Sequence, residues 1–248
     1  MTHLACAVFA DSSVAWWKVD FDPSLARENL ARGEGVSVEG RYRPPAKAED
    51  WSAEELYAAS ELYGTRVAEF ARHAVERGQP VGRGECWDFA HHALESVGNE
   101  GGDPPFPSIG RSHGALLYHA STSRRDERGR VVGEWYGGDG YVREGDAVEW
   151  RRVRVREVGG REGSYCLLGD PEHTAIVLTP LSSLSALTIA EQSLSHPPSI
   201  RTYDLRTLDE GEVWIYRPVG MRRLTGVEKV ETGWEELDRG SVEYRVVR

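Results

Sequence analysis

The order of predicted helices and strands constrains the fold of this 248-residue chain more than any other feature. Two helices are predicted first, over residues 51–77 and 85–97. Short strands separated by turns follow at 116–119, 146–155, 173–179, 187–191, 200–205 and 213–216. Helices followed by strands predict an α+β fold, in which the N-terminal core helices pack on an antiparallel β-sheet.

The helix predicted over residues 51–77 has clear signals at both ends. Ser52 and Glu55 have the spacing of a capping box, and Gly78 followed by Pro80 ends the helix. Apolar residues recur every three or four positions, so one face is predicted to be buried. The stripe consists of Leu56, Ala59, Tyr63, Val67, Phe70 and Ala74. The second helix repeats this pattern with Trp87, Ala90, Ala93, Leu94 and Val97.

The two ends of the chain differ from this central part. Residues 4–10 and 14–21 are predicted to form a hairpin around the turn at 11–13, and 22–50 a linker with one short helix near 23–32. In the polar tail, residues 242–247 are predicted to add an edge strand. These patterns predict an N-terminal hairpin and linker extension (1–50), a central domain (51–219) and a C-terminal extension (220–248).

Cys86 is the candidate nucleophile. It follows the glycine-rich residues 82–84 and opens the second helix, where free N–H groups and the helix dipole favour a thiolate. A lone cysteine is more often a small buried apolar residue. Glu85 and Asp88 lie beside it and would raise its pKa unless a histidine pairs with the thiol.

His173 and Glu191 are the candidate partners of Cys86. His173 begins an apolar strand, and the next strand ends in Glu191, Gln192 and Ser193. Cysteine, histidine and an orienting polar residue, in this order, are typical of a papain-like nucleophile site. Gln192 is a substitute for Glu191 in orienting the imidazole. Each residue alone also has a structural interpretation, as a core or surface side chain.

Four segments of the chain together resemble a known family. Residues 82–90, 173–177, 187–193 and 212–218 are similar to the cysteine-proteinase-fold domain at the C-terminus of fungal actin-patch adaptor proteins, and more distantly to CHAP and NlpC-type amidases. The resemblance covers residues 51 to 219 and implies a papain-like fold with Cys86, His173 and Glu191 as its triad. The CHAP-like enzymes have a Glu-x-Asn pattern here, and Ser193 stands at the asparagine position. The Src-homology-3 module of the adaptors is not recognisable, so we expect a free-standing relative.

Composition excludes several classes of partner. The net charge of −10 argues against nucleic acid, and no apolar run is long enough for a membrane span. The three cysteines, Cys6, Cys86 and Cys166, do not form a disulfide framework, and residues 4–10 make no convincing signal peptide. We therefore expect a cytoplasmic protein. No cofactor or metal motif is present; in particular, His91 has the wrong spacing from Cys86 for a zinc site.

Two functions remain open from the sequence. One is a papain-like cysteine hydrolase or acyltransferase acting on a peptide or amide bond through a Cys-His-Glu triad. The other is a catalytically weak or inactive protein-interaction module that retains the protease fold. The substrate or partner is a peptide or protein in both cases, and the sequence leaves its identity and the oligomeric state open.

Overall fold

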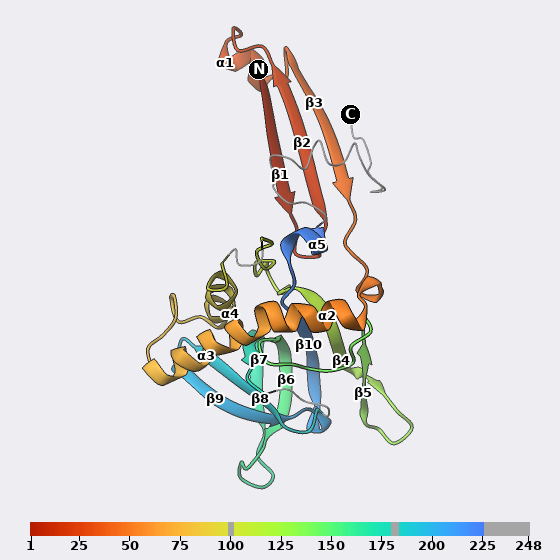
Figure 1. Ribbon diagram of the computed structural model, residues 1–248, viewed down its shortest axis with the longest axis vertical. Helices are drawn as coiled ribbons and strands as arrows, with labels where there is room; N and C mark the ends of the chain where they lie inside the picture. The colour runs from red at the N-terminus through yellow and green to blue at the C-terminus, as the bar shows by residue number, and fades with distance from the viewer. Residues whose placement is uncertain (99–101, 180–183, 226–248) are drawn as a thin grey trace. The chain divides into compact units, whose positions relative to one another are not determined.

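The computed structural model describes residues 1–98, 102–179 and 184–225 (Figure 1). The described residues divide into two compact units, one formed by Met1–Ala46 together with Met221–Thr225, the other by Lys47–Gly220. The edge strand predicted at 242–247 lies outside the described residues.

The N-terminal unit contains a three-stranded antiparallel sheet in the order β1-β2-β3. The predicted hairpin is confirmed as β1 (Thr2–Val8) and β2 (Val14–Phe21), and Asp11 closes its turn by accepting from the Ser13 N–H at 2.9 Å. The linker prediction is wrong for β3 (Val36–Arg43), which pairs along the whole of β2 and so satisfies its second edge. Two short helices, α1 (Arg27–Ala31) and α5 (Met221–Thr225), complete the unit.

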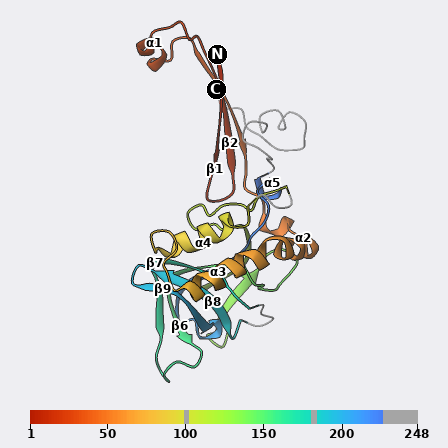
Figure 2. The same cartoon turned by 60° about the vertical axis from the view of Figure 1, so that its left-hand side comes forward.

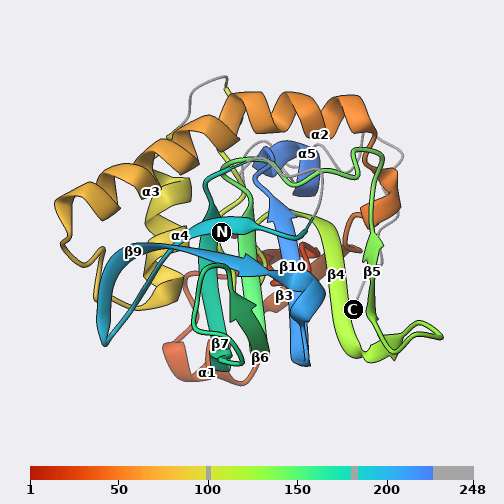
Figure 3. The same ribbon diagram turned by 90° about the horizontal axis from the view of Figure 1, so that it is seen from below.

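The larger unit is built on a seven-stranded antiparallel sheet in the order β5-β4-β10-β6-β7-β8-β9 (Figure 3). Its strands are β4 (Ala115–Arg125), β5 (Val131–Trp135), β6 (Ala147–Glu157), β7 (Cys166–Val177), β8 (Leu187–Ser193), β9 (His196–Asp204) and β10 (Glu210–Arg217). The central strands were predicted, but β4 and β7 are longer than expected. β5 was missed because it lies just past the charged loop that interrupts its hairpin with β4.

The helices of this unit lie on the sheet as one long interrupted rod and one shorter helix. The rod consists of α2 (Ala53–Ala59), a π-helical turn η2 (Ser60–Gly64) and α3 (Thr65–Arg77). The capping box of Ser52 and Glu55 is confirmed, as is the end at Gly78, whose φ of 62° is left-handed. At Gly64 the rod touches the loop before β6 so closely that an added Cβ would lie 2.6 Å from the Glu144 carbonyl oxygen.

The shorter helix α4 (Cys86–Glu95) packs beside α3, and both contact β7 and β8 (Figure 2). Two short 3-10 turns also occur in this unit: η1 (Ala48–Asp50) precedes α2, and η3 (Leu205–Thr207) connects β9 to β10. The apolar face of α4 enters the core through Phe89, Ala90, Ala93 and Leu94. Trp87, expected in that core, instead lines a cavity with its indole N–H donating to the Gly110 carbonyl at 3.0 Å. Among the described residues, no helix combines the length and apolar character needed to cross a membrane.

Candidate active site

The loop before Cys86 is shaped so that the thiol stands at the first position of α4. Gly82 and Gly84 adopt φ values of 60° and 86°, which favour glycine, and Glu85 precedes the helix in an extended conformation. An added Cβ at Gly82 would lie 2.8 Å from a carboxylate oxygen of Asp88. The chain therefore turns tightly over α4 before entering it.

Asp88 closes this loop from inside the helix. Its buried carboxylate accepts the Arg83 backbone N–H at 2.6 Å and the Arg83 guanidinium at 2.9 Å. The hydrogen bond from Arg83 lowers the pKa of Asp88. Glu85 also pairs with Arg83, at 2.9 Å. Glu85 and Asp88 were expected to raise the pKa of Cys86 unless a histidine paired with the thiol; His173 does pair with it, and the pKa of Cys86 is lowered.

Gln192 holds the same loop from the sheet. Its side-chain oxygen accepts from the Val81 N–H at 2.9 Å, and its amide donates to the carbonyl oxygens of Val81 at 2.9 Å and Glu85 at 2.8 Å. Gln192 is buried. Its amide is therefore committed to the loop that carries Cys86, and not to His173.

His173, Glu191 and Tyr203 form a hydrogen-bonded row across three neighbouring strands. His173 Nε2 lies 2.8 Å from Glu191 Oε2, and the Tyr203 hydroxyl donates to Glu191 Oε1 at 2.9 Å. Burial and the Glu191 charge raise the pKa of Tyr203, so its hydroxyl keeps its proton and remains a donor. Both carboxylate oxygens of Glu191 are thus engaged, which fixes the imidazole plane.

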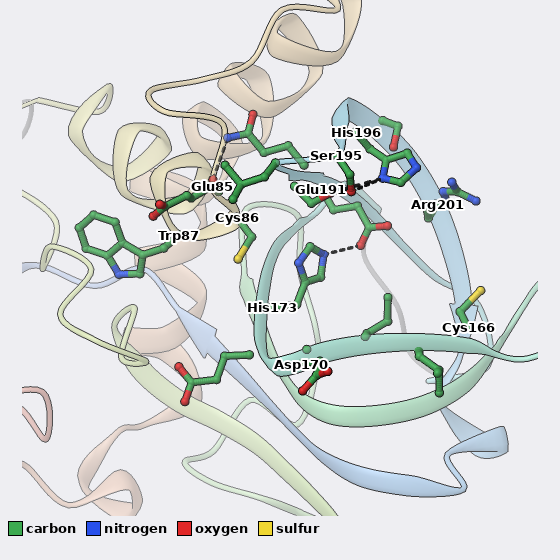
Figure 4. Close-up of a pocket in the computed structure, with 18 of the residues that line it drawn as sticks. Glu85, Cys86, Trp87, Cys166, Asp170, His173, Glu191, Ser195, His196 and Arg201 are labelled. Carbon is green, nitrogen blue, oxygen red and sulfur yellow. Dashed lines mark hydrogen bonds and ion pairs between the residues drawn. The ribbon is translucent and has the colours of Figure 1, made fainter.

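The Cys86 thiol completes the row at the other nitrogen of the imidazole ring. Figure 4 shows the sulfur beside the His173 ring nitrogen that does not face Glu191. Burial would raise the pKa of Cys86, but the hydrogen bond and charge of His173 and the Thr174 backbone N–H lower it below its ordinary value. Burial would lower the pKa of His173, but hydrogen bonds to Cys86 and Glu191 raise it to about 9. Both directions favour the ion pair of a thiolate and an imidazolium over the neutral pair.

The row opens into a cavity of about 840 Å³. Cys86, His173 and Glu191 line it, together with the exposed Leu167 and Leu194. Ser193 lies at the rim, 3.1 Å from the Ser195 hydroxyl oxygen and away from the imidazole. Cys166 lines the same cavity, and burial raises the pKa of its thiol. The cavity therefore holds two thiols with opposite tendencies to ionise.

The structure brings Cys86, His173 and Glu191 together, whereas Gln192 and Ser193 contact other groups. Sequence reasoning missed Tyr203, which appeared only as part of a predicted strand. It is buried between the half-buried Thr202 and Asp204, and no local pattern of the sequence indicates that it contacts Glu191. Over the described parts of the chain, no group of three or more His, Cys, Asp or Glu side chains is arranged to hold a metal ion.

Comparison with known proteins agrees with this architecture. A family model described as the AIM3/BBC1 cysteine proteinase-fold domain matches residues 39–229, and the chain belongs to this family. A curated relative, "Altered inheritance of mitochondria protein 3" of Debaryomyces hansenii, is 29% identical over 179 residues, which are 68% of this chain. The chain matches only 17% of the length of that relative. No solved structure matches the chain.

Proposed function

We propose that this protein is a papain-like thiol hydrolase or acyltransferase that acts on a peptide or amide bond, with a CHAP- or NlpC-like domain over residues 51–219 between N- and C-terminal extensions. The observation that carries the proposal is the row Cys86–His173–Glu191, which meets an open cavity at its sulfur end. A thiolate held by an imidazolium is the activated nucleophile of such enzymes.

In the proposed reaction, the Cys86 thiolate attacks the carbonyl carbon of the substrate and forms a new C–S bond. The carbonyl π electrons move to oxygen, and we expect the backbone N–H of Cys86 to donate to this oxyanion, because Cys86 begins α4. When the tetrahedral intermediate collapses, the C–N bond breaks and His173 gives its proton to the leaving amine. Glu191 holds the ring throughout.

The acyl thioester is then resolved by the reverse use of His173. The neutral imidazole removes a proton from water or from a second amine, which attacks the acyl carbon. The C–S bond breaks, and the thiolate and imidazolium are restored. Water gives hydrolysis, and an amine gives acyl transfer.

A second candidate function is a protein-interaction module that uses the same cavity without chemistry. Two observations favour it. The chain belongs to the AIM3/BBC1 cysteine proteinase-fold family, and its sequence resembles the domains of adaptor proteins. In addition, Ser193 stands where CHAP-like enzymes have asparagine. In this reading the exposed Leu167 and Leu194 contact an apolar segment of a partner protein.

The pH dependence of iodoacetamide alkylation separates the two candidates. Each cysteine is followed by peptide mass spectrometry in the intact chain, in the wild type and in His173→Ala. We expect Cys86 to react with an apparent pKa well below the free value of about 8.5, and this to be lost in His173→Ala. Cys166 is the internal control and should react alike in both. If Cys86 were alkylated slowly, and at the same rate in the wild type and in His173→Ala, the enzyme proposal would be overturned.

Turnover is tested with Cys86→Ala. A set of fluorogenic peptide amides, with and without an added amine acceptor, is offered to the wild type and the variant. We expect cleavage or transfer by the wild type alone, with both proteins folded by circular dichroism. Equal turnover by Cys86→Ala would contradict the mechanism.

A further inference from the structure

A second group of buried polar side chains lies near Cys86 but outside the cavity. Glu149 of β6 is 1% exposed and His113, from the loop before β4, is 0% exposed. Oε2 of Glu149 lies 3.4 Å from His113 Nε2, and His113 Nδ1 lies 2.8 Å from the Ser108 hydroxyl oxygen. None of these residues lines the cavity. Their role is therefore not direct contact with a substrate there.

Thr174 connects this group to the nucleophile. It pairs with Glu149 across β6 and β7, and its hydroxyl donates to Glu149 Oε2 at 2.8 Å. Its backbone N–H donates to the Cys86 sulfur. The pairing of β7 with β8 begins one residue later, at Ala175, so the strand is open to the thiol at this point.

We propose that Glu149 is a positioning residue for Cys86: it holds Thr174 by the hydroxyl, so that the Thr174 N–H meets the sulfur, and it opposes the thiolate with a buried negative charge. The inference rests on the proposed function, because it assumes that Cys86 is the nucleophile and gives His173 and Glu149 opposite effects on its thiolate. His173 favours the thiolate from the cavity side, and Glu149 limits its stability from outside the cavity. A thiolate that is stabilised too strongly is a weaker nucleophile.

Polar and charged groups from several elements surround Glu149. His113 and Thr174 contact its carboxylate, Cys86 lies beyond Thr174, and Tyr216 of β10 packs edge-on against the His113 ring, with centroids 5.8 Å apart. Burial and then the Glu149 charge raise the pKa of Tyr216, and the charge of Arg111 acts against this shift. The charge of Glu149 also acts to raise the pKa of Cys86. The carboxylate therefore acts on two different neighbours in the same sense.

Three variants of the full chain test the two parts of this role. Glu149→Gln keeps an oxygen acceptor and removes the charge, so the apparent pKa of Cys86 alkylation should fall by roughly half a unit to one unit. Thr174→Val removes the hydroxyl anchor at nearly constant shape, so the apparent pKa should rise. Thr174→Ser restores the hydroxyl and should return the value toward that of the wild type. Cys166 in the same samples should not change.

The outcomes are decisive in both directions. A purely structural role would lower the unfolding midpoint of the variants while leaving the Cys86 titration where it is in the wild type, and this would overturn the proposal. If Glu149→Gln fails to fold, the Thr174 pair decides: identical titrations of the valine and serine variants would also overturn it. The readout is ionisation of the thiol, not turnover. Failure of the proposed function is seen separately, as a wild-type Cys86 that is indifferent to His173→Ala.

Discussion

Two of the buried charge groups on the seven-stranded sheet, one around Arg217 and one around His173, differ in where their hydrogen bonds end. All five N–H donors of the Arg217 guanidinium are used: Nε and Nη2 bond Asp146, Nη1 bonds Asp139 and the Leu56 carbonyl, and Nη2 bonds the Tyr141 carbonyl. The His173 row ends instead at a sulfur that faces an open cavity of about 840 Å³. A charge group whose bonds are all satisfied internally supports the fold, and one that opens to a cavity is available for chemistry.

The largest expected effect is that of Arg217→Met on stability. The substitution leaves Asp139 and Asp146 buried without the cation that bonds both of them. We expect the free energy of unfolding to fall by about 3–5 kcal/mol, because uncompensated buried charge is costly. Urea denaturation followed by circular dichroism measures it.

The matched control for Arg217 is Arg206→Met, which breaks an ion pair at the surface. Arg206 Nη2 lies 2.8 Å from Asp204 Oδ2, but its side chain is 70% exposed. The expected loss is below about 1 kcal/mol. If Arg217→Met and Arg206→Met lowered the free energy of unfolding equally, the buried, fully hydrogen-bonded Arg217 would not differ from an exposed ion pair in its support of the fold.

Gln192→Leu sharpens the comparison. The side-chain hydrogen bonds of Gln192 are all made within the protein, as those of Arg217 are, yet Gln192 lines the cavity of the site. The substitution removes its three hydrogen bonds to the loop before Cys86 at similar volume. We expect a loss of about 2–3 kcal/mol in unfolding free energy, and slower Cys86 alkylation because the loop is no longer held.

Gln79→Leu, in the same loop but exposed, is the control for Gln192 and should change neither quantity. If Gln192→Leu slowed Cys86 alkylation without lowering the stability, Gln192 would act with the His173 row in the chemistry of the site, and not with Arg217 in support of the fold.

The sequence predicted the parts of this comparison unequally. Local signals sufficed where one element decides the geometry: Ser52 and Glu55 cap a helix through their own spacing, and Cys86 opens α4 after a glycine-rich loop. Glu191 followed from the resemblance and lies against His173. Arg217 was part of a segment that supported the resemblance, but its bonds to Asp139, Asp146 and Leu56 join distant segments that no local pattern connects.

The errors have the same origin. β3 was assigned to a linker because the benefit of pairing with β2 is not visible in residues 36–43 alone. Trp87 was assigned to the core because helical spacing does not show which part of α4 faces a cavity. The bonds from Arg83 to Asp88 were not predicted, because only the folded loop brings these two side chains together. Tertiary contacts decide each of these cases.

The Cys86–His173 pair should stabilise the protein in a defined pH window. The pKa of His173 is raised to about 9, so its contribution is fully present below its unfolded value of about 6.5 and is lost as pH rises through about 9. The pKa of Cys86 is lowered, so its contribution is present above its unfolded value and is lost as pH falls through its folded pKa. Between these limits the two contributions change with pH in opposite directions and give a plateau, which is lost as pH rises through about 9 and as it falls through the folded pKa of Cys86.

The measurement compares the wild type with Cys86→Ala/His173→Gln in urea from pH 5.5 to 10. We expect a difference of about 1–2 kcal/mol at pH 7.5 that shrinks on both sides of the plateau. The Arg206→Met difference should stay constant over pH 6 to 9.5, because Asp204, whose pKa is lowered by Arg206, and the arginine itself do not titrate there. A flat difference for the Cys86–His173 pair would mean that it is not ionised in the folded protein.

The smallest expected effect concerns Tyr203, which shares features with both groups: it is buried like Arg217, but it also lines the cavity and bonds Glu191. Tyr203→Phe removes the donor to Glu191 Oε1 and should lower the unfolding free energy by about 1 kcal/mol. Because Glu191 then holds the imidazole with less restraint, Cys86 alkylation at pH 7 should slow by a few fold. Tyr165→Phe, whose hydroxyl accepts from the exposed Arg156 at 3.1 Å, is the control. Loss of stability with unchanged alkylation would place Tyr203 with Arg217, as support for the fold alone.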